Sequence, residues 1–307
     1  MIFALIITLV FVVLAVVLPL ATRGERFAAR TERALPKAVG LDLPEVLIPS
    51  IRARNRSLVR HLSIGLGSGA VVGFLVSLLL PSLDGVVEFS KVWLVLGAVA
   101  IGAVIGTCIW VAREATRRAT QDAPLQREKG VGLFDYLPTW STVLAIVVVV
   151  LAIGIAAVLA WVMTTGAVEP GAEPLFVPIV IAFYAVVAAL VLGLGFIAVQ
   201  VHRPQRAASP EHLAWDDAVT VQAIFPIVYL AGFFAALLVG QLFTSVSSSI
   251  FYSDRSNEVR SVLLLLVAAP LPIYVLALVS IVAKPARHFV KRLWPAVPAA
   301  PNVPPAV

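Results

Sequence analysis

The chain has 307 residues, of which 60% are hydrophobic and 13% are charged. Soluble domains contain about 45–50% apolar residues, so this composition excludes an ordinary water-soluble protein. The net charge of +6 follows the membrane topology described below, so nucleic acid is not an expected partner. The single cysteine excludes an internal disulfide and a cysteine metal cluster.

Seven apolar runs are each long enough to cross a bilayer as a helix, because about 20 residues at about 1.5 Å per residue span roughly 30 Å. They predict an all-α, polytopic transmembrane helix bundle that forms a single domain, residues 1–294. The runs cover residues 2–20, 62–80, 92–112, 141–163, 176–199, 219–243 and 261–283. The first run is expected to be an uncleaved anchor, and the proline-rich tail, 295–307, to be disordered.

Basic residues are concentrated in alternate connections between the runs, which sets the predicted orientation. Of the 23 Lys and Arg residues, 20 lie in these connections and in the C-terminal segment, nine of them in the basic loop 22–60. Because basic residues near span ends stay in the cytoplasm, we predict an external N-terminus and a cytoplasmic C-terminus in a bacterial cytoplasmic membrane. The basic loop is expected to bind anionic lipid headgroups.

Local patterns predict what the basic connections form. In the basic loop, a helix is predicted from Arg23 to Leu35 that ends at Pro36, and an interfacial segment from Pro44 to Arg60. After the third run, the helix is expected to continue until Pro124 ends it. Glu114 and Arg118 then have the four-residue spacing of a favourable ion pair.

Small residues recur every four residues in the second and third runs, which are joined by a predicted polar turn around Pro81, Asp84 and Lys91. This spacing lets two helix backbones approach closely in lipid, where packing drives helix association. The hairpin is therefore predicted to be the tightest helix contact in the protein. Its packing residues are Gly65, Gly69, Gly73 and Ser77 in the second run, and Ala98, Gly102 and Gly106 in the third.

Polar residues and prolines are concentrated in the last three runs. Pro226, Pro270 and Pro272 each remove a backbone donor, so kinks and freed carbonyls are expected. One interpretation is a polar cavity for an uncharged or amphipathic ligand; the other is that the polar side chains bond to the freed backbone and to neighbouring helices. The side chains concerned are Tyr184, Gln222, Tyr229, Gln241 and Tyr274.

No motif in the sequence predicts a catalytic residue, a metal site or a cofactor. Ionisable residues are missing from the middle of all seven runs, which argues against a proton-coupled transporter or pump. The zinc motif His-Glu-x-x-His, the Gly-x-Ser-x-Gly elbow and a phosphate loop are missing too. Asp216 and Asp217 lie beside His212, and capping of the sixth helix is a sufficient explanation for both carboxylates.

Three connections share a short pattern. Residues 131–138 resemble residues 39–44, and residues 213–218 occupy the equivalent place before the sixth run. Each pattern places a carboxylate near the start of an even-numbered helix, where the helix dipole favours negative charge. An internal repeat of runs one to three in runs five to seven is one interpretation.

The segment from Arg203–Pro204 to Trp215–Asp216–Asp217–Ala218 lies among arginine-rich connections and Ala/Val-rich runs. It resembles uncharacterised multi-pass membrane proteins of high-G+C Gram-positive, actinobacterial type, a resemblance that implies no activity. The sequence favours a non-catalytic scaffold or membrane subunit of a transport or envelope assembly, with a membrane protein or a second copy of the chain as partner. The alternative is a permease for a neutral or lipid-like small molecule.

Overall fold

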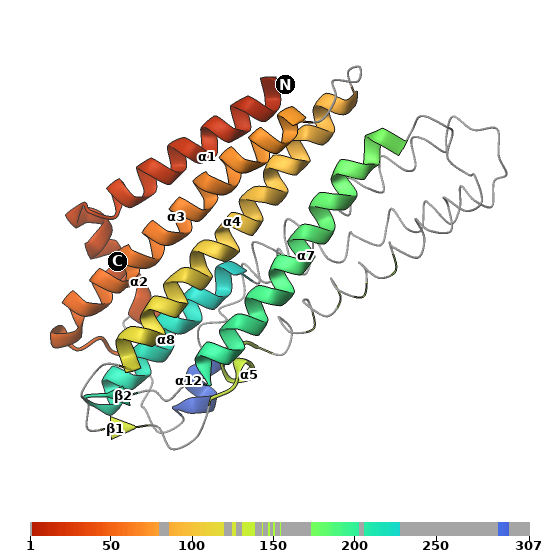
Figure 1. The fold of residues 1–307 in the computed structure, drawn as a ribbon. Coiled ribbons are helices and arrows are strands. Elements are labelled where there is room, and N and C mark those ends of the chain that lie inside the picture. The colour runs from red at the N-terminus through yellow and green to blue at the C-terminus, as the bar shows by residue number, and fades with distance from the viewer. Residues whose placement is uncertain are drawn as a thin grey trace, which may run out of the picture.

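The computed structural model describes residues 2–79, 86–119, 125–126, 131–138, 173–202, 206–227 and 288–294, and the single residues Val143, Val147, Val150 and Gly154. Within these ranges the chain is helical apart from one pair of two-residue strands. The long helices lie side by side in one layer, in the order α1, α3, α4, α7 (Figure 1).

Four of the described helices are long and apolar enough to cross a membrane, which supports a membrane location. They are α1 (Ile2–Ala21), α3 (Ile48–Leu79), α4 (Val86–Ala119) and α7 (Glu173–Val201). These helices confirm the first, second, third and fifth predicted runs. Helix α8 (Pro210–Pro226) enters the sixth run. Four parts of the prediction lie outside the described residues: nearly all of the fourth run, the rest of the sixth, the whole of the seventh, and the tail.

Several short elements gather at one end of the long helices (Figure 1). They are α2 (Glu25–Val39), η1 (Glu45–Leu47), β1 (Leu125–Gln126), α5 (Leu133–Tyr136), β2 (Arg206–Ala207) and α12 (His288–Leu293). Strands β1 and β2 pair antiparallel, with Leu125 opposite Ala207. We call this region, made of residues 22–61, 113–119, 125–126, 131–138, 206–218 and 288–294, the basic end.

The predicted end of α2 at Pro36 was wrong, because the helix continues through that proline to Val39. It ends at Gly40, which adopts the left-handed conformation (φ 82°) and donates its N–H to the Pro36 carbonyl at 2.7 Å. Glycine suits this position because it has no Cβ to clash. The longer helix buries both Leu35 and Val39.

Most of the segment predicted to be interfacial, Pro44–Arg60, is helical, because residues 48–60 form the first turns of the 32-residue helix α3. Its position at the membrane interface stays a prediction. No glycine or proline interrupts residues 50–64, and arginine is a good helix former, so nothing separates the basic turns from the apolar ones. Ile51, Arg54 and Leu58 recur on one buried face of these turns. This face makes the basic part of α3 a packed element of the protein.

Helix α4 differs from its sequence prediction at its start, whereas the predictions for its other end stay untested. It begins at Val86, so Lys91 is a buried helical residue and does not belong to the predicted polar turn. At the other end Glu114 pairs with Arg117, three residues along, whereas the side chain of Arg118 is outside the described part. The described helix ends at Ala119, before Pro124.

Helices α3 and α4 touch backbone to backbone along the two ridges of small residues. A Cβ built on Gly65 would overlap the Gly102 carbonyl oxygen, and one on Gly102 would overlap that of Gly65. Likewise, a Cβ on Gly69 would overlap the Ala98 carbonyl, and one on Gly106 that of His61. The contact extends to Gly73, which faces Ala98, and to buried Ser77, whose hydroxyl donates to the Phe74 carbonyl at 2.7 Å.

Candidate functional site

A buried cluster of charged side chains joins three helices at the basic end. Arg54 of α3 lies between Glu114 of α4 and Asp216 of α8, with 2.8 Å between its Nε and Glu114 Oε1. The side chains of Arg54 and Asp216 are 6% and 0% exposed. Burying a charge is costly unless it is paired, and here opposite charges face each other. The cluster therefore fixes α3, α4 and α8 against one another.

The helix-capping explanation of Asp216 and Asp217 was wrong, because α8 begins at Pro210 and places both aspartates about two turns inside the helix. The N-cap is Ser209, whose hydroxyl oxygen accepts a hydrogen bond from the His212 amide at 3.1 Å. Hydrogen bonds from its own backbone amide and from the Ser209 hydroxyl lower the pKa of Glu211 in this first turn. The two aspartates therefore serve contacts between segments.

Asp217 is a second buried centre, which binds two aromatic side chains. Tyr136 of α5 donates its hydroxyl to Asp217 Oδ1 at 2.7 Å, and Trp294, directly after α12, donates its indole N–H to Oδ2 at 3.0 Å. An ion pair of 2.6 Å between Arg292 Nε and Asp135 Oδ1 also links α12 to α5. Asp217 therefore fastens segments that are far apart in the sequence to the start of α8.

Replacing Tyr136 with phenylalanine removes one donor from the buried Asp217 carboxyl and changes little else in shape. We expect the free energy of unfolding to fall by about 1.5–3 kcal/mol, the usual range for a hydrogen bond to a charged group. The measurement is thermal unfolding in detergent. As a control, Phe134→Leu changes an exposed aromatic side chain two residues away and is expected to have little effect. An equal effect of both variants would contradict the role given to the hydroxyl.

The three segments with the shared sequence pattern meet around α8. The Trp215 indole N–H donates to the Asp42 carbonyl at 2.9 Å, which ties residues 39–44 to residues 213–218. Tyr136, in residues 131–138, reaches Asp217 as described above. The internal repeat itself stays a prediction. The shared pattern nevertheless marks segments that lie together in the fold.

The cluster holds its charges by mutual pairing. Arg117 donates to Glu114, and His212 Nε2 lies 3.8 Å from Asp216 Oδ1. Among the described residues, no three His, Cys, Asp or Glu side chains are placed to hold a metal ion. The arrangement is suited to joining helices.

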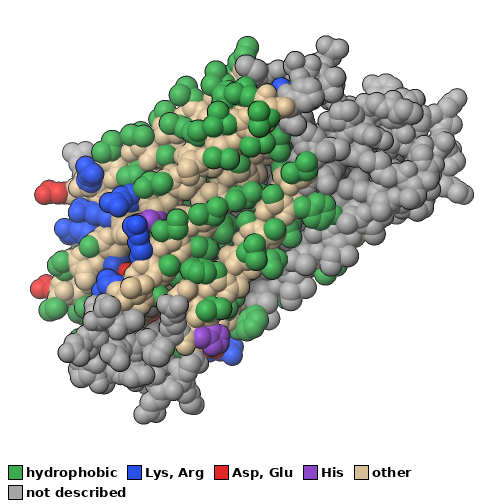
Figure 2. Space-filling view, viewed as in Figure 1, with side chains coloured by type: hydrophobic (Ala, Val, Ile, Leu, Met, Phe, Trp, Pro, Cys, Tyr) green, Lys and Arg blue, Asp and Glu red, His purple; other side chains and the backbone are tan. Residues whose placement is uncertain are grey.

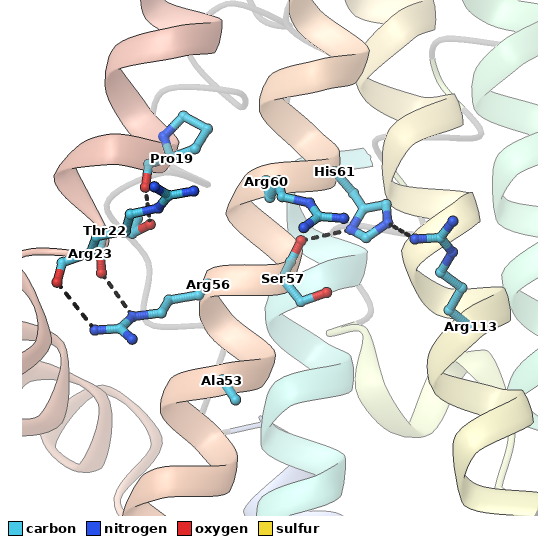
Figure 3. A pocket seen from close by; sticks show the side chains of 9 residues that line it. All are labelled: Pro19, Thr22, Arg23, Ala53, Arg56, Ser57, Arg60, His61 and Arg113. Carbon is cyan, nitrogen blue, oxygen red and sulfur yellow. Dashed lines mark hydrogen bonds between the residues drawn. The ribbon is translucent and has the colours of Figure 1, made fainter.

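A separate pocket opens on the opposite face of α3, between α3 and the end of α1 (Figure 3). Its volume is about 450 Å³. Four arginines and a histidine dominate its wall, and none of the described residues that line it carries a carboxylate. The lining residues are Pro19, Thr22, Arg23, Ala53, Arg56, Ser57, Arg60, His61 and Arg113.

Of the predicted polar-cavity residues, the two that the structure describes, Tyr184 and Gln222, do not line this pocket. Tyr184 is half-buried on α7, in edge-to-face contact with Phe183 at 5.4 Å between ring centroids. Gln222 is half-buried on α8. Tyr229, Gln241 and Tyr274 lie outside the described residues, so the cavity stays a prediction.

Sequence reasoning missed the residues of the buried cluster. Arg54 was grouped with the other arginines of the basic loop, although its helical spacing to Ile51 and Leu58 places it on an apolar face. For Asp216, the overlooked signal was Ser209 followed by Pro210, a typical helix start that places the aspartate inside the helix.

Comparison with known protein families, curated proteins and solved structures finds no match to this chain. The class of the protein therefore rests on its own features. Its described part is all-helical apart from one strand pair, with four helices able to cross a membrane and a charged cluster at one end. These features are those of a helical membrane protein.

Proposed function

We propose that the chain is a non-catalytic integral membrane protein, a scaffold or membrane subunit of a transport or envelope assembly. The observation that carries this proposal is the pairing of the buried charges. Arg54, Glu114 and Asp216 face one another across three helices, and Asp217 binds the side chains of two further segments. Groups used in this way hold helices in place, which favours a rigid membrane framework over a reacting centre.

The proposed placement is a multi-pass one in a bacterial cytoplasmic membrane, with seven spans, an external N-terminus and the basic end in the cytoplasm. Two features support it. Helix α1 leaves most of its apolar side chains exposed, as suits a helix surrounded by lipid. Most Lys and Arg side chains visible in Figure 2 gather at one end of the described surface, next to a wide hydrophobic face. This charge distribution favours a cytoplasmic basic end.

Native mass spectrometry of the chain, extracted from its own membranes in mild detergent, tests the proposed function. We expect a second membrane protein or a second copy of the chain at fixed stoichiometry. We also expect liposomes that contain the purified chain alone to show no uptake of neutral solutes. The opposite result would identify a permease: the chain is found without a partner, mediates uptake by itself, and loses that uptake in Gln222→Leu.

A further inference from the structure

The basic pocket between α1 and α3 has an unusual charge balance for a partly enclosed site. Arg23, Arg56, Arg60 and Arg113 contribute four guanidinium groups to its wall. The nearby carboxylates Glu114 and Asp216 lie on the other side of α3, where Arg54 and Arg117 pair with them. Like charges around one cavity repel one another, so an anion in the pocket would relieve this repulsion.

Helical phase explains why α3 has two different basic faces. Ala53, Arg56, Ser57 and Arg60 follow the three- and four-residue spacing of one helix face and line the pocket toward α1. Arg54 lies about 100° or more away from most of this face and points at α4 and α8. The pocket arginines are therefore separate from the buried cluster.

Two of the pocket arginines are held in position by hydrogen bonds to the protein (Figure 3). Arg56 crosses from α3 to the end of α1, where its Nε donates to the Thr22 carbonyl at 2.9 Å and its Nη2 to the Arg23 carbonyl at 3.4 Å. A guanidinium group has five N–H donors, so Arg56 retains donors for a ligand. Its position is set before binding, which reduces the entropic cost of binding.

His61 orients the second of these arginines. Its Nδ1 lies 2.8 Å from the Ser57 carbonyl oxygen, which can only accept, so Nδ1 carries the proton. The lone pair is then on Nε2, which accepts a hydrogen bond of 2.7 Å from Arg113 Nη1. This chain of contacts brings a guanidinium group from α4 to the pocket wall. The side chain of Arg60 bonds to no residue in the described part of the chain, so its donors are available to a ligand.

The pocket lies where the apolar parts of two helices meet their polar parts. On α1 the apolar stretch ends at Ala21, just after the pocket residue Pro19, and on α3 the apolar run begins after His61. Exposed apolar side chains continue from this level along both helices, among them Val16, Val17 and Ile64. A ligand with a phosphate group and acyl chains could therefore place the phosphate in the pocket and the chains along α1 and α3.

We propose that this pocket binds the phosphate group of an anionic membrane lipid through Arg23, Arg56, Arg60 and Arg113. Arginine suits this ligand because its planar donors match the oxygens of a phosphate group. The inference rests on the proposed placement of the basic end at the headgroup level of the membrane. It goes beyond the general attraction of basic loops to lipid, because it names one pocket with fixed donors.

The test is native mass spectrometry of the full-length chain in a non-ionic detergent, titrated with phosphatidylglycerol, with phosphatidylcholine of the same acyl chains, or with inorganic phosphate. We expect phosphatidylglycerol to bind at least about tenfold more tightly than phosphatidylcholine. The double variant Arg60→Gln/Arg113→Gln is expected to lose at least about tenfold in phosphatidylglycerol affinity, because two charge-assisted contacts become neutral.

The matched control is Arg33→Gln/Lys291→Gln, which removes the same charge from exposed sites outside the pocket. The phosphatidylglycerol affinity of this control is expected to stay within about twofold of that of the unsubstituted chain, because exposed charges are screened. If the double pocket variant fails to fold, Arg60→Gln alone makes the same comparison, since it breaks no hydrogen bond or ion pair with the described residues.

Three results would overturn the proposal: equal binding of the two lipids, equal losses in the pocket and control variants, or inorganic phosphate that binds and displaces phosphatidylglycerol. The last result would identify a soluble phosphate compound as the ligand of the same arginines. None of these readouts depends on a protein partner, so their failure is distinguishable from the failure of the proposed scaffold function.

Discussion

Replacing Arg54 with methionine is expected to lower the free energy of unfolding by roughly 3–5 kcal/mol, the usual cost of removing one partner from a buried ion pair. The loss is large because two acidic groups, Glu114 and Asp216, face the same guanidinium group. Methionine is unbranched, flexible and close to arginine in volume, so the change removes charge more than volume. The measurement is the stability of the purified chain to heat in detergent.

A second substitution separates lost pairing from lost packing. In Arg54→Met/Asp216→Leu both the cation and the most buried carboxyl are replaced with apolar groups, and Glu114 retains Arg117. We expect the double variant to recover part of the stability, since apolar replacements of a buried pair are often tolerated. Arg52→Met, at an exposed position two residues away, is the control. A double variant less stable than the single one would show that the ion pair is not the cause.

Gly65→Ala is expected to destabilise the chain by about 1–3 kcal/mol, although alanine is the better helix former. A Cβ at this position would overlap the Gly102 carbonyl oxygen, so α3 and α4 would have to separate. The separation would disturb the neighbouring contacts of Gly69 and Gly106 as well. Loss of thermal stability in detergent is the measurement.

The chain provides a matched control for this substitution in α7. Gly195 also lies within a long helix, but a Cβ there would meet no atom of another described segment within 4 Å. Gly195→Ala is therefore expected to be neutral or to stabilise the helix by up to about 1 kcal/mol. If the two alanine variants had the same effect, close approach of α3 and α4 would not be the reason for Gly65.

The long helices could be predicted from the sequence because the thickness of a bilayer sets the length of an apolar run. Helices α1, α3, α4 and α7 each contain a predicted run. Their polar extensions could not be bounded in the same way. The apolar run in α3, for example, begins directly after His61, whereas the helix itself extends in both directions from that residue. A helix continues into its polar part because no helix-breaking residue interrupts it and because one of its faces is buried.

The site was harder to predict because its partners are far apart in the sequence. Arg54 and Asp216 are separated by 162 positions, and composition cannot indicate which of the nine basic residues in the basic loop will meet a carboxylate. Arg52 and Arg54 differ only in helical phase, yet one is exposed and the other is buried. Phase becomes informative only when the neighbouring helices are known. The Ser209–Pro210 start of α8 was the one local signal for the aspartates.

The continuity of α3 also limits how this protein can change in length. One unbroken helix carries the Arg54 face, the pocket face and the glycine ridge. Inserting a single residue near Leu62 would rotate the ridge by about 100° relative to both arginine faces and shift it by about 1.5 Å. Either the α4 contact or the contacts with α1 and α8 would then be out of register. The spacing between arginines and glycines is thus a constraint on the chain as strict as their identities.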